Sequence, residues 1–144
     1  MINLRRANNE DIQPICSFDQ IAVNNEENRR DFIAKSIESG VCFVAEIDGK
    51  VVGYTVFDYT FYSNGMIDML YIHPEHRRQG IGTKLVKHVE LICKTEKLFT
   101  STNQSNLLMQ GLLNKLGYVP SGVIDNLDED DPEIVYFKRV KKNR

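Results

Sequence analysis

A short glycine-containing loop at residues 77–83 has the residue types of an anion-binding site. Arg77 and Arg78 are followed by Gly80 and Gly82, and the loop connects an apolar strand to an amphipathic helix. The first turn of a helix presents unpaired N–H groups and the positive end of the helix dipole, and both stabilise a bound anion. The glycines let the backbone approach a ligand closely, and the arginines add positive charge. The loop therefore predicts a ligand that carries phosphate.

Two common phosphate-binding motifs do not fit this loop. A dinucleotide-binding GxGxxG motif requires a third glycine where the chain has Leu85, and it also requires a surrounding parallel βαβ unit. A P-loop requires Gly-Lys-Ser/Thr, whereas Gly82 is followed by Thr83 and Lys84. Taken alone, two glycines before a helix are equally consistent with an ordinary tight connection.

The elements expected to position this loop form a mixed sheet with helices on its faces. Hydrophobic periodicity and turn residues predict strands at residues 2–6, 41–47, 51–61, 66–73, 98–102, 118–124 and 134–140. They predict one helix that begins after Asp11 and others at residues 26–39, 80–95 and 105–116. The order is β-α-α-β-β-β-α-β-α-β-β, an α/β (α+β) mixed-sheet fold with an antiparallel meander at 41–73. Its length of 144 residues favours a single domain over residues 1–144.

Turn and capping residues predict where several of these elements end. Asp48-Gly49-Lys50 and Ser63-Asn64-Gly65 are typical of hairpin turns. Asp11 and Ser105 are candidate N-cap residues, because their side-chain oxygens can accept from the free amides of a first helical turn. Gly117 is expected to end the preceding helix in a left-handed conformation.

The composition argues against nucleic-acid and membrane partners. Eighteen Lys and Arg residues stand against 20 Asp and Glu residues, which gives a net charge of −2 rather than the basic balance of a nucleic-acid-binding domain. The longest apolar stretches fall far short of the roughly 20 residues that span a bilayer. The polar segment after Met1 lacks the apolar core of a secretion signal, so we expect a cytoplasmic protein.

Cysteine and histidine residues do not predict a metal site. Cys16, Cys42 and Cys93 lie among apolar neighbours without CxxC spacing, so we expect free thiols in the core. His73 and His76 have no further Cys or His ligand nearby in the sequence, and we expect no metal.

The loop and two later segments together resemble a known enzyme family. Arg77-x-x-Gly80-x-Gly82 after an apolar strand resembles the R/Q-x-x-G-x-G/A loop of the GCN5-related N-acetyltransferase (GNAT) superfamily. Asn106 and the segment Lys115-Leu116-Gly117-Tyr118 are similar to its N-x(8)-K-x-G-F/Y signature. The segment from Ile2 to Ile12 looks like the first strand and helix of that family, so the resemblance covers nearly the whole chain.

The resemblance implies that acetyl-coenzyme A is the cosubstrate. It implies that the strand before the loop pairs with the pantetheine arm and the thioester oxygen, that loop amides bind the pyrophosphate, and that Asn106 bonds the pantetheine or nearby backbone. The implied cofactor-binding residues are Leu70, Tyr71, Ile72, Arg77, Arg78, Gln79, Gly80, Ile81, Gly82, Thr83 and Asn106.

The implied reaction is direct attack of a primary amine on the thioester, and Asp68 is our candidate base. Asp68 lies in an apolar strand on the same face as Leu70. The alternative is a strand residue bonded to backbone, or a charge at the sheet edge. The family often has a tyrosine acid seven residues after the asparagine, where this chain has Leu113. Tyr118 is our candidate replacement, with Tyr71 or water as alternatives.

The sequence does not identify the acceptor amine, which we expect to belong to a small molecule or a peptide. The acidic loop Asp125–Glu133 either attracts cationic amines or is a solvated hairpin connection. From position alone, the acceptor site is expected near Phe18, Asn28, Arg29, Phe32, Tyr59 and Tyr62. A homodimer through a strand edge is a further expectation. The alternative function is a CoA-binding module with weak or no catalysis.

Overall fold

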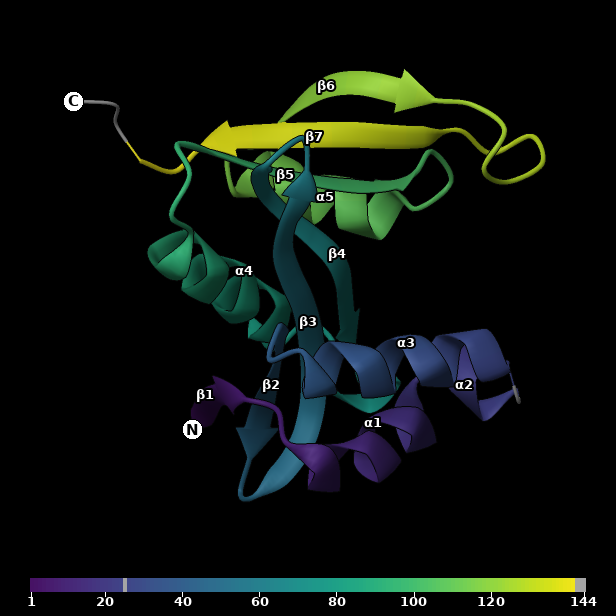
Figure 1. Cartoon of the computed structure of the whole chain (residues 1–144), viewed down its shortest axis with the longest axis vertical. Coiled ribbons are helices and arrows are strands. Elements are labelled where there is room, and N and C mark those ends of the chain that lie inside the picture. Colours follow the sequence, from purple (N-terminus) through teal and green to yellow (C-terminus); the bar gives the residue numbers. More distant parts are fainter. Residues whose placement is uncertain (25, 142–144) are drawn as a thin grey trace. The chain divides into compact units, whose positions relative to one another are not determined.

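Residues 1–24 and 26–141 are described by a computed structural model of the chain (Figure 1). The strands are β1 (Ile2–Arg6), β2 (Cys42–Ile47), β3 (Lys50–Phe61), β4 (Asn64–Ile72), β5 (Lys97–Asn103), β6 (Val119–Ile124) and β7 (Glu133–Arg139). The helices are α1 (Ile12–Phe18), α2 (Gln20–Val23), α3 (Glu27–Glu38), α4 (Ile81–Ile92) and α5 (Leu107–Lys115), with 3-10 turns η1 (Asn9–Asp11) and η2 (Pro74–His76). The short helix α2 and both 3-10 turns are additional to the predicted elements.

Seven strands form a mixed sheet, which confirms the predicted fold class. Hydrogen-bonded neighbours follow the order β1-β2-β3-β4-β5-β7-β6. The pairs β1–β2, β2–β3, β5–β7 and β6–β7 are antiparallel, whereas β4 and β5 are parallel. The β4–β5 register runs from Gly65 to Ile67 in β4. The backbone groups that follow in β4 therefore lie beyond the β5 ladder.

The chain divides into two units, and the first has a sheet between two layers of helices. This unit contains residues 1–57 and 69–89. Ile15, Ile33 and Val44 belong to one apolar cluster, in which α1 and α3 pack against the strands. The next strand residue, Ala45, belongs to a second cluster with Leu85 of α4. Consecutive strand residues point to opposite faces, so α1–α3 cover one face and α4 covers the other (Figure 1).

The second unit contains residues 58–68 and the chain from Glu90 onward. Here β5, β7 and β6 combine with α5 and with the hairpin end of β3 and β4 (Figure 1). Leu98 and Leu113 are fully buried, and Thr100 Oγ1 donates a 3.0 Å hydrogen bond to the Ile67 carbonyl. By contrast, β6 is an exposed edge strand along its whole length.

Two of the predicted turn and cap residues are displaced by one position. The second hairpin turn uses Tyr62 and Ser63, with φ of +52° and +64°, so β4 begins at Asn64 rather than after a turn at Ser63-Asn64-Gly65. Helix α5 is capped by Asn106, whose Oδ1 accepts from the Met109 amide at 3.1 Å. Ser105 is not the cap, because its hydroxyl donates to Asp131 at 2.6 Å.

Asp11 occupies the N-cap position of α1, as predicted, but the expected side-chain contact is wrong. Asp11 makes no side-chain cap hydrogen bond to α1. Its carboxylate accepts two hydrogen bonds from the Arg5 guanidinium, at 2.8 and 2.9 Å, and one from the Asn8 amide. The charged guanidinium is the stronger partner, and it holds the pKa of Asp11 below its usual range. The left-handed Gly117, with φ of +92°, does end α5 as predicted.

Candidate functional site

The loop before α4 presents free backbone amides. Gly80 adopts φ of +79°, and the Lys84 amide donates to its carbonyl at 3.1 Å. The amides of Ile81, Gly82 and Thr83 precede this first helical hydrogen bond, so they have no acceptor within the helix. Gln79 and Gly80 are exposed, and the side chain of Ile81 is buried in the core. The residues predicted to bind pyrophosphate therefore include an exposed loop and the start of a helix whose first amides have no acceptor within the helix.

Arg77 holds the loop against the end of β4. Its Nε donates to the Ile72 carbonyl at 3.3 Å, and its guanidinium lies 5.6 Å from the centre of the Tyr71 ring. Arg78, which follows, has φ of +64°, a conformation that is uncommon for a residue with a side chain. The contacts of Arg77 hold the loop beside the end of β4.

Gly53 of β3 allows β3, β4 and α4 to approach closely, and sequence reasoning missed it. A Cβ at this position would lie 3.0 Å from Ile72 Cδ1, 3.2 Å from Ile81 Cγ2 and 3.3 Å from the Tyr71 carbonyl oxygen. A glycine inside an apolar strand is the available signal for such an approach. Gly53 thereby sets the position of both the strand end and the helix start that carry the predicted site.

We expect Gly53→Ala to lower the free energy of unfolding by about 1–3 kcal/mol, because the added methyl overpacks this contact. Urea unfolding measures the change, and the slope of unfolding with denaturant should stay constant. The control is Gly122→Ala in β6, where a Cβ meets nothing within 4 Å. Equal free energies of unfolding in the two variants would show that the close approach at Gly53 does not contribute to stability.

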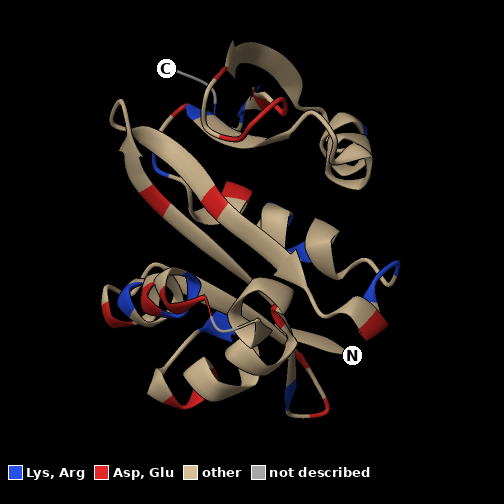
Figure 2. Cartoon of the chain, turned by 90° about the vertical axis from the view of Figure 1, so that its right-hand side faces the viewer, with Lys and Arg blue, Asp and Glu red and all other residues tan. Residues whose placement is uncertain are grey.

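Asp68, the candidate base, shares its surroundings with a second carboxyl group, that of Asp58. The two are the acidic residues of β4 and β3, and both belong to the second unit (Figure 2). Asp68 keeps an exposed surface, yet neighbouring protein atoms desolvate its carboxyl group, and Asp58 both bonds to it and repels its charge. These effects raise the pKa of Asp68 to about 7. Thr60 fixes Asp58 through two hydrogen bonds, at 3.2 and 2.8 Å.

The hydroxyl group of Tyr118, the candidate acid, is engaged with another side chain. It donates to Glu90 Oε2 at 2.8 Å, and Lys138 Nζ contacts the same carboxylate at 3.1 Å. Burial, assisted by the bond to Glu90, raises the pKa of Tyr118. Leu113, at the position of the family tyrosine, is fully buried. The assignment of Tyr118 as the acid stays a prediction, and its hydroxyl would have to leave Glu90 to fulfil it.

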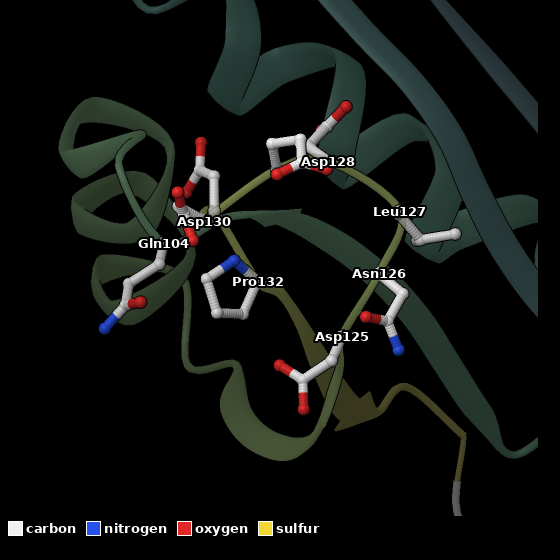
Figure 3. A pocket seen from close by; sticks show the side chains of 9 residues that line it. Gln104, Asp125, Asn126, Leu127, Asp128, Asp130 and Pro132 are labelled. Atoms are coloured by element: carbon white, nitrogen blue, oxygen red, sulfur yellow. The ribbon is translucent and has the colours of Figure 1, made fainter.

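The acidic loop encloses a hollow in the second unit, lined by Gln104 and residues 125–132 (Figure 3). Asp128 accepts from Asn103 Nδ2 at 2.8 Å, and Asp131 accepts from the Ser105 amide and hydroxyl. These bonds tie the β6–β7 connection to the segment before α5. Within the described ranges, 1–24 and 26–141, no cluster of His, Cys, Asp and Glu is arranged to hold a metal ion.

Two further findings concern the remaining sequence predictions. Cys16, Cys42 and Cys93 are free and buried, as expected for core thiols. No helix in the described part of the chain has both the length and the apolar composition to cross a membrane.

Comparison with known proteins gives consistent matches over most of the chain. Residues 5–118 match the model of the acetyltransferase (GNAT) family. The chain is 33% identical to an uncharacterized N-acetyltransferase of Methanocaldococcus jannaschii over 107 residues, which cover 71% of this chain and 68% of that protein. A GNAT-family acetyltransferase structure from Bacillus cereus has a TM-score of 0.89 at 33% identity, covering 100% of this chain and 99% of that one. A Salmonella typhimurium protein solved with its cofactor acetyl-CoA shares the fold, with a TM-score of 0.76 at 17% identity, covering 99% and 95% of the two chains.

Proposed function

Because the chain belongs to the acetyltransferase (GNAT) family, we propose that it transfers the acetyl group of acetyl-CoA to a primary amine of a small molecule or peptide. The observation that carries this proposal is the N-terminus of α4, whose first amides have no acceptor within the helix. It follows the end of β4, which lies beyond the β5 ladder, after the connection at residues 73–80. The family acts through acetyl-CoA-dependent N-acetylation, and the proposal assigns its parts to residues of this chain.

The β4 end and the loop fit the two parts of acetyl-CoA that need polar partners. The backbone of Leu70, Tyr71 and Ile72 follows the last β4 residue paired with β5, so its edge groups can bond the pantetheine amides. The amides of residues 78–83 would bind the pyrophosphate, and the dipole of the twelve-residue helix α4 would add to their attraction for it. Asn106 caps α5, so we assign it a role in fixing the start of that helix.

Asp68 is the proposed base. Acetyl-CoA supplies an activated acetyl thioester when bound. An amine of pKa about 10.4 is neutral in only about one molecule in 2,500 at pH 7, so it must lose a proton before it attacks. Asp68 has a pKa of about 7, close to the working pH, which suits a group that accepts this proton. It lies two residues before Leu70 in β4.

The missing family tyrosine at Leu113 does not exclude catalysis. A thiol has a pKa of about 8.5, so its thiolate is a good leaving group near neutral pH and needs little assistance from an acid. Water can supply that proton while the Tyr118 hydroxyl remains bonded to Glu90. The Asp68→Asn variant tests the alternative of a CoA-binding module without turnover.

We expect acetyl-CoA at 100 times its Kd to stabilise the protein by about 2.7 kcal/mol. For a chain of this size the melting temperature should rise by about 5–11 °C. The double variant Arg77→Ala/Gly82→Trp should show no rise in melting temperature with acetyl-CoA, because an indole side chain blocks the approach to the loop amides. Gly122→Trp in β6, where the space around the glycine is open, should retain it. The absence of any shift in the wild type at millimolar acetyl-CoA would contradict the proposed function.

A further inference from the structure

Thr100 of β5 lies where the pairing between β4 and β5 ends. The parallel register between these two strands finishes with Ile67 opposite Thr100. Beyond this point β5 continues to Asn103 in register with β7, and the next residue of β4 is Asp68. Thr100 is therefore the last β5 residue in register with β4, and its partner in β4 directly precedes the proposed base.

The Thr100 hydroxyl holds the peptide group that joins Ile67 to Asp68. Its Oγ1 donates to the Ile67 carbonyl at 3.0 Å. Thr100 and Ile67 are only 1% and 2% exposed, so water is not available to replace the hydroxyl as a donor. A buried carbonyl that loses a donor loses stability, and such groups keep their partners in native proteins. The bond is therefore a lasting restraint on the direction of this carbonyl.

The geometry of the peptide group transmits this restraint to Asp68. The carbonyl carbon and oxygen of Ile67 lie in one plane with the amide nitrogen and the Cα of Asp68, because the peptide bond does not rotate freely. A donor that fixes the direction of the carbonyl also fixes this plane, and with it the position of the Asp68 Cα. Only the side-chain torsions of Asp68 then remain to place its carboxyl group.

The carboxyl group of Asp68 needs an accurate position because it is bonded to the carboxyl group of Asp58. Asp58 accepts from the amide and the hydroxyl of Thr60, at 3.2 and 2.8 Å. A hydrogen bond weakens steeply when its angle departs from the preferred range, so a small displacement of Asp68 would weaken its bond to this fixed partner. Thr100, Asp58 and Asp68 all belong to the second unit. The two bonds are therefore parts of one local arrangement.

We propose that Thr100 is a positioning residue for the reaction, because its hydroxyl holds the peptide group before Asp68 and thereby keeps the carboxyl group of Asp68 bonded to Asp58. This inference rests on the proposed function, in which Asp68 is the base. Thr100 acts through the backbone and touches neither acetyl-CoA nor the amine. A merely structural role for Thr100 would stabilise the sheet and leave the titration of Asp68 unchanged, so the two roles lead to different results.

Carbon-13 NMR of the aspartate carboxyl groups in the whole protein tests this role without any substrate. Asp68→Asn identifies the Asp68 resonance by its loss, and in the wild type this resonance should titrate with a pKa of about 7. Thr100→Val keeps the shape of the side chain but cannot donate. Its desolvation of Asp68 remains while the contribution of Asp58 weakens, so the midpoint should fall by at least about one pH unit.

Two further variants serve as controls. Thr100→Ser keeps the hydroxyl and should retain the wild-type midpoint. Thr102→Val makes the same replacement two positions further along β5, beyond the pairing with β4, and should also retain it. With an amine that the wild type acetylates, Thr100→Val should lower kcat by about 10- to 100-fold, the scale expected for a misplaced catalytic group, with an unchanged Kd for acetyl-CoA.

Three results would overturn the inference. They are a midpoint in Thr100→Val equal to that of the wild type, a midpoint that Thr100→Ser does not retain, and a wild-type Asp68 that titrates near the value of about 3.9 of a free aspartate. Thr100→Ala, which adds no atoms to the core, replaces Thr100→Val if the latter does not fold. A wild type that binds no acetyl-CoA would instead contradict the proposed function, and the titration of Asp68 would still be measurable, so the two failures are distinguishable.

Discussion

Asp68→Asn is expected to lower kcat by about 10²- to 10⁴-fold, the usual contribution of a positioned general base. Asparagine has nearly the same shape but cannot accept the ammonium proton, so the affinity for acetyl-CoA should be unchanged. Release of free CoA thiol measures the rate, and calorimetry measures the affinity. An unchanged kcat would remove Asp68 from the mechanism. A wild type that binds acetyl-CoA but acetylates no amine would favour the alternative of a non-catalytic CoA-binding module.

The pH dependence follows from the raised pKa of Asp68. Below about pH 7 the carboxyl group is protonated and cannot accept a proton, so kcat/KM should fall as the pH decreases through 7. Asp58→Asn removes the opposing charge, so the pKa of Asp68 should fall and the acidic limb of the profile should move to lower pH. A limb that stays at the same pH in Asp58→Asn would show that another group controls the profile.

The same pKa shift separates loss of rate from loss of stability. The folded-state pKa of Asp68 lies above that of an unfolded aspartate, so its contribution to stability is present at low pH and is lost as the pH rises through 7. Asp68→Asn removes this ionisation. At pH 8 the variant should therefore be at least as stable as the wild type, and a slow variant cannot be explained by unfolding.

Local sequence patterns predict the parts of the site that lie close together in the chain. Gly80 and Gly82 before a helix predict an anion-binding loop, and Asp68 stands out as a charge in an apolar strand. The fold class follows from periodicity in elements such as α4 and β5, each of which buries one regular set of positions. The turn at Tyr62 and Ser63 was misplaced by one residue, since Asn and Gly at the next positions are equally good turn formers.

Residues whose roles depend on distant partners could not be assigned from the sequence. The hydroxyl of Tyr118 finds Glu90, 28 positions away. The pKa of Asp68 depends on Asp58, which the sequence places simply near the end of a strand. Arg29 was named from position alone, whereas its contact with Met69 spans 40 residues. Pairings of this kind are set by sheet and helix packing rather than by any local pattern.

Asp19→Ala is expected to lower the free energy of unfolding by about 3–5 kcal/mol, because it leaves the buried guanidinium of Arg29 without its counter-charge. The Tyr54 hydroxyl and the amides of Ile21 and Ala22 lose their acceptor as well. A loss of this size is a large fraction of the 5–15 kcal/mol typical of a domain. Urea unfolding measures it, with Asp31→Ala, an exposed aspartate of α3, as the control expected within about 0.5 kcal/mol of the wild type.

A double variant separates the loss of the ion pair from the loss of the hydrogen bonds. In Asp19→Ala with Arg29→Met, no buried charge is left unpaired, so the double variant should be more stable than Asp19→Ala alone. Tyr54→Phe removes only one donor to the Asp19 carboxylate and should lower the free energy of unfolding by about 1.5–3 kcal/mol. If the free energy of unfolding of the double variant instead falls by the sum of the losses in Asp19→Ala and in Arg29→Met, Asp19 and Arg29 do not interact. Asp19 would then not be the residue that orients Arg29.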